Sequence, residues 1–178
     1  MRQAWEADLE SIKHRMPSRW ARWVQPRLVV LPAWCTGRRA GAWTLFNCII
    51  ITQQQRDCPE GVRRYVLGHE FGHIARGHTA LQWAWLAGAL LYVGGISHPA
   101  AIATSLVIQT MVMAKMLSTR QEAARELSAD DVAVELFGAS VALEGARWMC
   151  AQRGDGEGAV RRRRLARLEE CVERDRRL

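Results

Sequence analysis

The spacing of hydrophobic and polar residues predicts a mainly helical chain with a small β element in its N-terminal part. Apolar residues recur with helical periodicity over residues 3–15. The apolar run 28–31 and the β-branched, alternating run 44–52 predict two strands that pair with each other. Further helices are predicted over 59–76, 80–93, 99–117, 118–137, 139–152 and 159–176. The predicted fold class is therefore mainly α, an α+β domain with a small N-terminal β-sheet or hairpin.

An uncharged stretch is the main change in composition along the chain. Residues 77–114 contain no Asp, Glu, Lys or Arg, and a Gly- and Pro-containing break over 94–99 splits them into an apolar helical hairpin, 80–117. The first helix is shorter than the roughly 20 residues that a membrane span needs, although its aromatic residues suit a membrane interface. We predict that the hairpin inserts into a membrane as transmembrane helices or associates tightly with one, with packing on the protein core as the alternative.

The hairpin and two flanking composition shifts suggest three segments. Residues 1–27 combine an amphipathic helix with a segment rich in Trp and Arg, in which Trp20 and Trp23 could add a surface anchor. Residues 28–152 form the central domain, including the hairpin. Residues 153–178 are a Gly-rich linker and a basic closing helix.

Composition and charge narrow the class of protein. A chain of 178 residues with 49% hydrophobic and 24% charged residues can build one folded core, which excludes wholesale disorder. The net charge of +7 comes almost entirely from arginine, but no nucleic-acid-binding motif accompanies it, so we expect no nucleic-acid partner. Five cysteines without close pairing favour a reducing compartment, and no cleavable signal peptide is expected at the N-terminus.

The candidate chemistry begins with the motif His-Glu-Phe-Gly-His at 69–73, inside a predicted helix. Residues four apart lie about 40° apart around a helix, so His69 and His73 can both reach one metal ion. Imidazole nitrogens suit Zn²⁺, and a catalytic zinc takes three protein ligands and keeps one position open. Glu70 lies beside this pair, where a carboxylate could take a proton from a water molecule activated by zinc.

The third ligand must come from another part of the chain, and Glu126 is the best candidate. Glu126 and Asp130 share one face of a predicted helix, so Glu126 could bind the metal while Asp130 accepts the outer N–H of a ligating histidine. A solvated acidic face is the alternative for this helix alone. His78 is the weaker candidate, because on a continuing helix it would lie about 140° from His73 and act as a surface residue or a support behind the ligands.

These motifs together resemble the Ste24/HtpX-type zinc metallopeptidases, which are gluzincins of peptidase family M48. The resemblance rests on HEFGH at 69–73, on the apolar hairpin, and on RELSAD at 125–130. Residues 44–52 are similar to the edge strand of the family, and RLARL at 164–168 resembles its closing helix. The resemblance implies a zincin-like peptidase fold, with the apolar hairpin between the two zinc-binding helices.

It also implies the site and its reaction. One Zn²⁺ per chain would be bound by His69, His73 and Glu126, with Asp130 supporting the ligands and Glu70 as the general base. The edge strand would border the cleft and pair with an extended peptide, which makes Asn47 a candidate substrate-binding residue. Arg164 is a further candidate, as a donor to the oxyanion of the tetrahedral intermediate.

The expected function is therefore zinc-dependent hydrolysis of peptide bonds inside polypeptides, including unfolded or membrane proteins. The alternatives are a zinc-binding membrane interaction protein without turnover and a soluble HExxH peptidase of another family. Membrane lipid is an expected partner. We expect association with the inner or cytoplasmic membrane with the site facing the cytoplasm, and a soluble cytoplasmic protein is the alternative.

Overall fold

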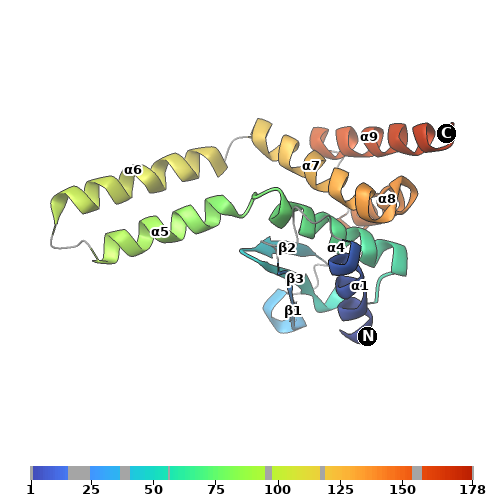
Figure 1. The fold of residues 1–178 in the computed structure, drawn as a ribbon, viewed down its shortest axis with the longest axis horizontal. Helices are drawn as coiled ribbons and strands as arrows, with labels where there is room; N and C mark the ends of the chain where they lie inside the picture. Colours follow the sequence, from blue (N-terminus) through green and yellow to red (C-terminus); the bar gives the residue numbers. More distant parts are fainter. Residues whose placement is uncertain are drawn as a thin grey trace.

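A helical body with a small three-stranded sheet carries a long two-helix arm (Figure 1). The computed structural model describes residues 2–15, 25–36, 41–55, 57–94, 98–116, 119–153 and 158–177. In chain order the elements are α1 (Arg2–Arg15), β1 (Arg27–Leu31), α3 (Ala33–Thr36), β2 (Ala42–Leu45), β3 (Cys48–Thr52), the 3₁₀-helix η1 (Gln53–Gln55), α4 (Glu60–Ala75), α5 (Ala80–Gly94), α6 (Pro99–Met116), α7 (Thr119–Phe137), α8 (Ala139–Arg153) and α9 (Ala159–Asp175). The prediction of a mainly helical chain with a small sheet is confirmed.

Two predicted features fall on residues that the structure does not describe. Trp20 and Trp23, proposed as a surface anchor, lie outside the described residues, as does most of the predicted Gly-rich linker. The three-segment division of the chain stays a prediction.

Strand β2 is an edge strand of the three-stranded sheet. The strand order of that sheet is β1-β3-β2, with β1 parallel and β2 antiparallel to β3, so β2 lies at an edge. The run 44–52, predicted as one strand, is instead the end of β2, a turn, and β3. The turn lies at Phe46, whose φ of 53° is in the left-handed region that side chains other than Gly and Asn rarely adopt. No Gly at this position marked the turn in the sequence.

The hydrophobic core lies between the inner face of the sheet and the helices α1, α4, α7 and α8. β3 contributes Ile49 and Ile51, both fully buried, and α1 contributes Trp5, which is 1% exposed. α1 is also held to α4 by an ion pair between Asp8 and Arg63. The core therefore anchors α4, the helix that carries the HEFGH motif, on several sides.

Two glycines allow α7 to approach α4 closely. A Cβ added at Gly72 would lie 2.8 Å from the Ala129 backbone, and one at Gly68 would lie 3.1 Å from the Phe137 ring. A Cβ essentially never lies 2.8 Å from another backbone, so α7 would have to shift away from α4. The four-residue spacing of these glycines thus brings the acidic residues of α7 next to the histidines of α4.

We expect Gly72→Ala to destabilise the fold by about 1–3 kcal/mol, the usual cost of overpacking a tight core. Gly61→Ala on the same helix is the matched control, because its Cβ would meet only the flexible Glu144 carboxylate, at 3.2 Å. It should be neutral or stabilising, since Ala favours helix over Gly. Urea denaturation of both variants checks this. Equal stabilities would show that Gly72 does not set the distance between α4 and α7.

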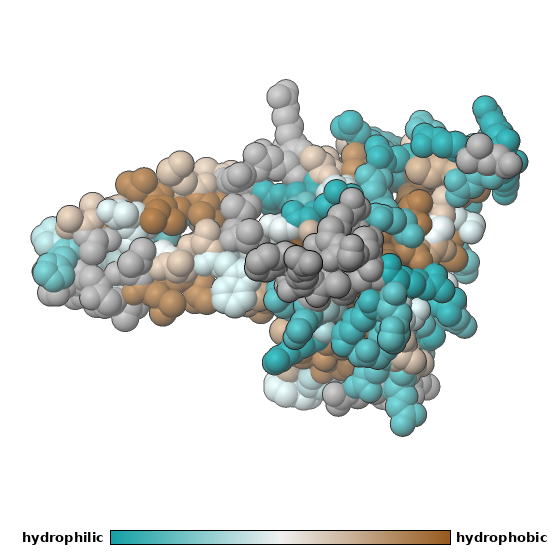
Figure 2. Space-filling model, in the orientation of Figure 1, coloured by the Kyte–Doolittle hydropathy of each residue, from teal (hydrophilic) through white to brown (hydrophobic). Residues whose placement is uncertain are grey.

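The arm, helices α5 and α6, projects from the body as an apolar hairpin (Figure 1). The two helices approach each other at Gly88, whose carbonyl oxygen accepts a hydrogen bond of 2.6 Å from the buried Ser105 hydroxyl. Figure 2 shows hydrophobic, brown-coloured surface along the arm. The exposed large apolar side chains of the arm are Trp83, Trp85, Leu90, Tyr92, Leu106, Val107, Met111 and Met113. Among the described residues, none of the arm belongs to the hydrophobic core, so the structure does not show the alternative of a hairpin packed on that core.

Within the described part of the chain, no helix is both long enough and apolar enough to cross a membrane. α5 has 15 residues and spans about 22 Å, against a hydrocarbon core of about 30 Å. α6 has 18 residues but includes Thr104, Gln109 and Thr110. The prediction of transmembrane helices is therefore not supported.

Candidate metal centre and cleft

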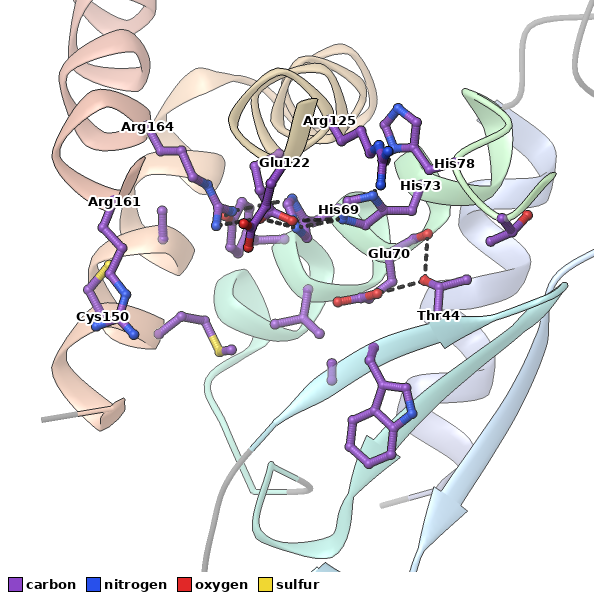
Figure 3. A pocket seen from close by; sticks show the side chains of 18 of the residues that line it. Thr44, His69, Glu70, His73, His78, Glu122, Arg125, Cys150, Arg161 and Arg164 are labelled. Carbon is purple, nitrogen blue, oxygen red and sulfur yellow. Dashed lines mark hydrogen bonds and ion pairs between the residues drawn. The ribbon is translucent and has the colours of Figure 1, made fainter. Parts of the chain in front are cut away.

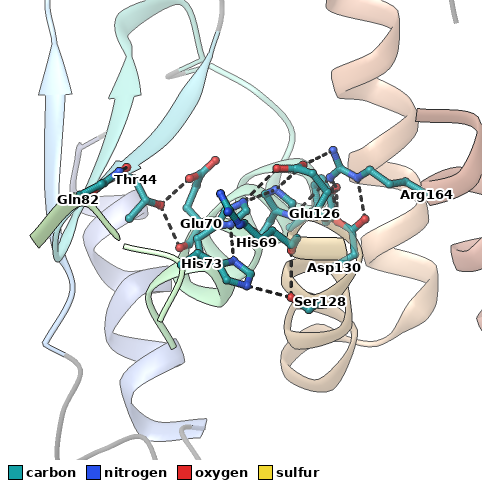
Figure 4. Close-up of polar contacts among 12 residues, drawn as sticks. Thr44, His69, Glu70, His73, Gln82, Glu126, Ser128, Asp130 and Arg164 are labelled. Atoms are coloured by element: carbon teal, nitrogen blue, oxygen red, sulfur yellow. Dashed lines mark hydrogen bonds and ion pairs between the residues drawn. The ribbon is translucent and has the colours of Figure 1, made fainter. Parts of the chain in front are cut away.

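Three side chains from two helices converge on one point. His69 and His73 extend from α4, and Glu126 extends from α7 (Figure 4). The two Nε2 atoms are 3.3 Å apart, and the Glu126 carboxylate oxygens lie 3.4 Å from His69 Nε2 and 3.3 Å from His73 Nε2. The structure thus brings together the three residues that the sequence suggested as ligands.

These separations fit a tetrahedral metal ion. Zinc bonds of about 2.0–2.1 Å at tetrahedral angles place ligand atoms about 3.3–3.4 Å from one another. Two imidazole nitrogens and one carboxylate are also a ligand set of catalytic zinc sites. Both the donor types and their geometry therefore suit Zn²⁺.

A buried group of polar side chains holds the first of these histidines. The Asp130 carboxylate, 1% exposed, accepts a hydrogen bond of 2.9 Å from His69 Nδ1, which leaves Nε2 free to bind a metal. Tyr65 donates its hydroxyl to the same Asp130 oxygen at 2.9 Å. Arg164, from α9, binds both Asp130 oxygens, at 2.8 and 2.9 Å, and one Glu126 oxygen at 2.7 Å. Helix α9 therefore fixes Glu126 and Asp130 of α7 in place.

Hydrogen bonds and charges set the protonation of this group. Burial raises the pKa of Asp130, but hydrogen bonds from His69 and Arg164 lower it more, to about 2. For Glu126, burial raises the pKa, and hydrogen bonds from both histidines hold it far below its usual range. Burial lowers the pKa of His69, but hydrogen bonds to Asp130 and Glu126 raise it to about 9. The carboxylates of Asp130 and Glu126 thus favour a positive charge at His69, and a metal cation bound at Nε2 would provide such a charge in place of the proton.

His78 supports the second histidine, and the end of α4 explains how. Gly77 takes a φ of 71°, and the N–H groups of Gly77 and His78 bond to the carbonyls of Ile74 and His73. This Schellman turn folds the chain back on the helix, so that His78 Nδ1 lies 2.8 Å from His73 Nδ1. The prediction that His78 points away from His73 is therefore wrong, because the helix does not continue to His78. Its alternative role as a support behind the ligands fits this contact.

The hydrogen bonds of His78 engage only the Nδ1 side of His73, so His73 Nε2 faces His69 Nε2 and Glu126 in the triad. Burial and the charge of His73 lower the pKa of His78 to about 4, so its ring is neutral at pH 7. We assign His73 Nδ1–H as the donor to His78 Nδ1, and His78 Nε2–H as the donor to Ser128 Oγ at 3.2 Å. The Ser128 hydroxyl then donates to the Arg125 carbonyl at 3.0 Å. Every donor proton in this series of hydrogen bonds, from His73 to the Arg125 carbonyl, therefore has an acceptor.

Glu70 points away from the ligands, towards β2. Its carboxylate Oε2 lies 2.6 Å from the Thr44 hydroxyl, and Figure 4 shows Glu70 between Thr44 and the histidines. Glu70 is 7% exposed. A carboxylate beside a metal centre, not part of the ligand triad and oriented by a hydroxyl, is placed to act as a base.

A cleft of 320 Å³ lies over the triad and Glu70 (Figure 3). β2 forms one wall with Ala42, Trp43 and Thr44, and α7, α8 and α9 form the other. Among the described residues that line the cleft, those from the sheet all belong to β2. Asn47 lies in the turn after β2, and its carbonyl accepts a hydrogen bond from the Arg27 N–H. The structure therefore does not place Asn47 in the cleft.

The structure also gives Arg164 a further role and adds residues that the sequence reasoning missed. Arg164 lines the cleft, and in this structure its guanidinium binds Asp130 and Glu126 and so supports the ligands, while its role as a donor to the oxyanion stays a prediction. Tyr65 lies one helical turn before His69, so helical spacing could have indicated it. Thr44 carried no such signal, because its contact with Glu70 spans 26 residues.

Comparison with known proteins identifies the family. The model of peptidase family M48 matches residues 11–148, which include every residue of the triad and Glu70. Comparisons with curated proteins and with solved structures gave no match. Because the family model covers most of the sequence, the chain belongs to peptidase family M48, whose activity is the hydrolysis of peptide bonds.

Proposed function

We propose that this protein is a zinc-dependent endopeptidase in which His69, His73 and Glu126 hold the metal and Glu70 is the general base. The observation that carries the proposal is the triad itself. Its two Nε2 atoms are 3.3 Å apart, and each lies 3.3–3.4 Å from one of the two Glu126 carboxylate oxygens. The carboxylate of Glu70 lies at the same cleft but outside the triad. The apolar hairpin between the two ligand helices supports a place in the Ste24/HtpX-type branch of the family.

Zinc bound there would act as a Lewis acid, polarising the scissile carbonyl and making a water molecule more acidic. The residues of the chain perform the remaining steps. Glu70 takes a proton from the attacking water and passes it to the leaving amine. Thr44 holds the Glu70 carboxylate in place through their 2.6 Å contact. Asp130 keeps His69 in the tautomer that binds metal through Nε2.

The alternative that is not an enzyme is a zinc-binding interaction protein without turnover. The arrangement of Glu70 argues against it, since a metal scaffold needs no oriented carboxylate facing a cleft. The family match also argues against a peptidase of an unrelated HExxH family. Purified, zinc-loaded protein should cut unfolded casein at internal bonds, as mass spectrometry of the fragments would show, and a zinc chelator should stop the reaction. Intact casein after incubation with zinc-loaded protein would favour the scaffold.

We also propose that the protein works at a membrane surface. The support is the arm, whose exposed apolar residues include Leu106 and Val107, and the basic net charge of +7, which suits anionic lipid. The protein should float with anionic phospholipid vesicles in a density gradient. Leu106→Glu with Val107→Glu should weaken flotation, while Val29→Glu, at an exposed apolar residue of β1, should not. Wild-type protein that stays at the bottom of the gradient would contradict the proposal.

A further inference from the structure

The outer edge of β2 carries backbone groups that an extended polypeptide could pair with. Thr52 N–H donates to the Gly41 carbonyl, and the antiparallel register pairs Trp43 with Ile50. In such a ladder alternate residues bond to the neighbouring strand, so the N–H and C=O groups of Ala42 and Thr44 point outward. This edge borders the cleft beside Glu70.

Part of that edge is already occupied by one side chain of the arm. The amide oxygen of Gln82 accepts a hydrogen bond of 2.7 Å from the Phe46 N–H. Its amide nitrogen donates to the Thr44 carbonyl oxygen at 3.2 Å. One primary amide therefore bonds the two outward groups that flank Leu45, as the backbone of a paired strand would. Figure 4 shows Gln82 beside Thr44, next to Glu70.

The neighbouring residue of the arm strengthens this contact. The Trp83 ring packs on the Phe46 ring, with centroids 4.2 Å apart. Phe46 is the residue with the left-handed φ of 53°, a conformation that persists only where its surroundings hold it. Gln82 binds its N–H and Trp83 binds its side chain, so the first turns of α5 hold the end of β2 in its present shape.

We propose that Gln82 controls substrate entry by occupying the strand edge next to Glu70, so that an extended polypeptide must displace its amide to pair with β2 beyond Thr44. The inference rests on the proposed peptidase function and adds the residue that limits which substrates reach the site. Because Gln82 belongs to α5, movement of the arm moves this residue as well. A substrate that shifts the arm can pair with the whole outer edge of β2. A short free peptide must instead compete with the Gln82 amide for the Thr44 and Phe46 backbone groups.

The residue type fits this role. Gln offers one donor and one acceptor on the same planar group, which is what the C=O of Thr44 and the N–H of Phe46 require. The two bonds are neutral and partly exposed, so each contributes modestly and substrate can displace them. Removing the amide should therefore ease binding of substrate without changing the chemical step.

The test uses zinc-loaded full-length protein and a fluorescent peptide substrate. Gln82→Ala should lower KM by about tenfold with kcat nearly unchanged, as expected when two weak hydrogen bonds no longer compete. Gln82→Met keeps the length and apolar stem of the side chain and should act alike, which guards against a folding defect. Gln109→Ala is the matched control, since Gln109 lies on α6 and its amide contacts Ser105 rather than β2.

A second measurement does not depend on turnover. The Phe46 amide should exchange its hydrogen faster in Gln82→Met than in wild type, because it loses its acceptor. Hydrolysis by wild type with an unchanged or raised KM in both Gln82 variants would overturn the inference and leave the peptidase function standing. An equal fall in KM for Gln109→Ala would also overturn it, by assigning the effect to the arm as a whole. Absence of hydrolysis in wild type would overturn the proposed function and this inference with it.

Discussion

Replacing Glu70 by Gln is expected to lower peptide hydrolysis by at least about a hundredfold, the usual contribution of a general base, while zinc stays near one per chain. The substitution keeps the shape of the side chain and removes its ability to take a proton. Zinc should remain because Glu70 lies outside the triad and its carboxylate is held by Thr44. Initial rates on casein, with zinc measured in the same samples, check both parts.

Glu122→Gln is the matched control for this experiment. Glu122 lines the same cleft and is exposed, and the chemical change is identical. Its activity should stay within a few-fold of wild type. Near wild-type hydrolysis in Glu70→Gln with zinc retained would mean that another group is the base.

The second large effect is expected at Glu126. Glu126→Ala removes one of the three ligands and leaves the positive charge of Arg164 next to the two histidines. Zinc affinity should fall by more than about a hundredfold, beyond the loss typical of a residue that only supports the ligands. Competition with a chelator of known affinity measures this fall, and activity should be lost with the metal.

Glu122→Ala tests whether any acidic residue of α7 would have the same effect. Glu122 lies one helical turn before Glu126 and does not belong to the triad. Zinc affinity should therefore stay close to that of wild type. Equal losses in the two variants would mean that α7 attracts zinc by its charge rather than binding it through Glu126.

The positions of the helices, and the residue pairs that share a helix face, were predictable from the sequence because the sequence features that indicate them are local. Helical spacing places His69 and His73 on one face of α4, and it places Glu126 and Asp130 on one face of α7. Gly138, with a φ of 88°, ends α7 close to where the sequence predicted. Those signals depend on backbone geometry within one or two turns, which the sequence expresses directly.

The rest could not be predicted because it depends on contacts between distant segments. The turn at Phe46 has an unfavourable φ that Gln82 and Trp83 hold, and they lie 36 and 37 residues further along the chain. Likewise, the position of His78 follows from the turn at Gly77 rather than from helical periodicity. The role of Arg164 depends on how α9 docks on α7. Each is a case in which tertiary packing overrides a local expectation.

The central claim is that two histidines of α4 and one glutamate of α7 together bind the catalytic zinc. Crystals of zinc-loaded protein, with diffraction data collected on both sides of the zinc absorption edge, test it most directly. One anomalous peak per chain is predicted, about 2.0–2.1 Å from the Nε2 atoms of His69 and His73 and in bonding contact with the Glu126 carboxylate. Absence of a peak there in zinc-loaded crystals, or a peak coordinated by other residues, would contradict the account.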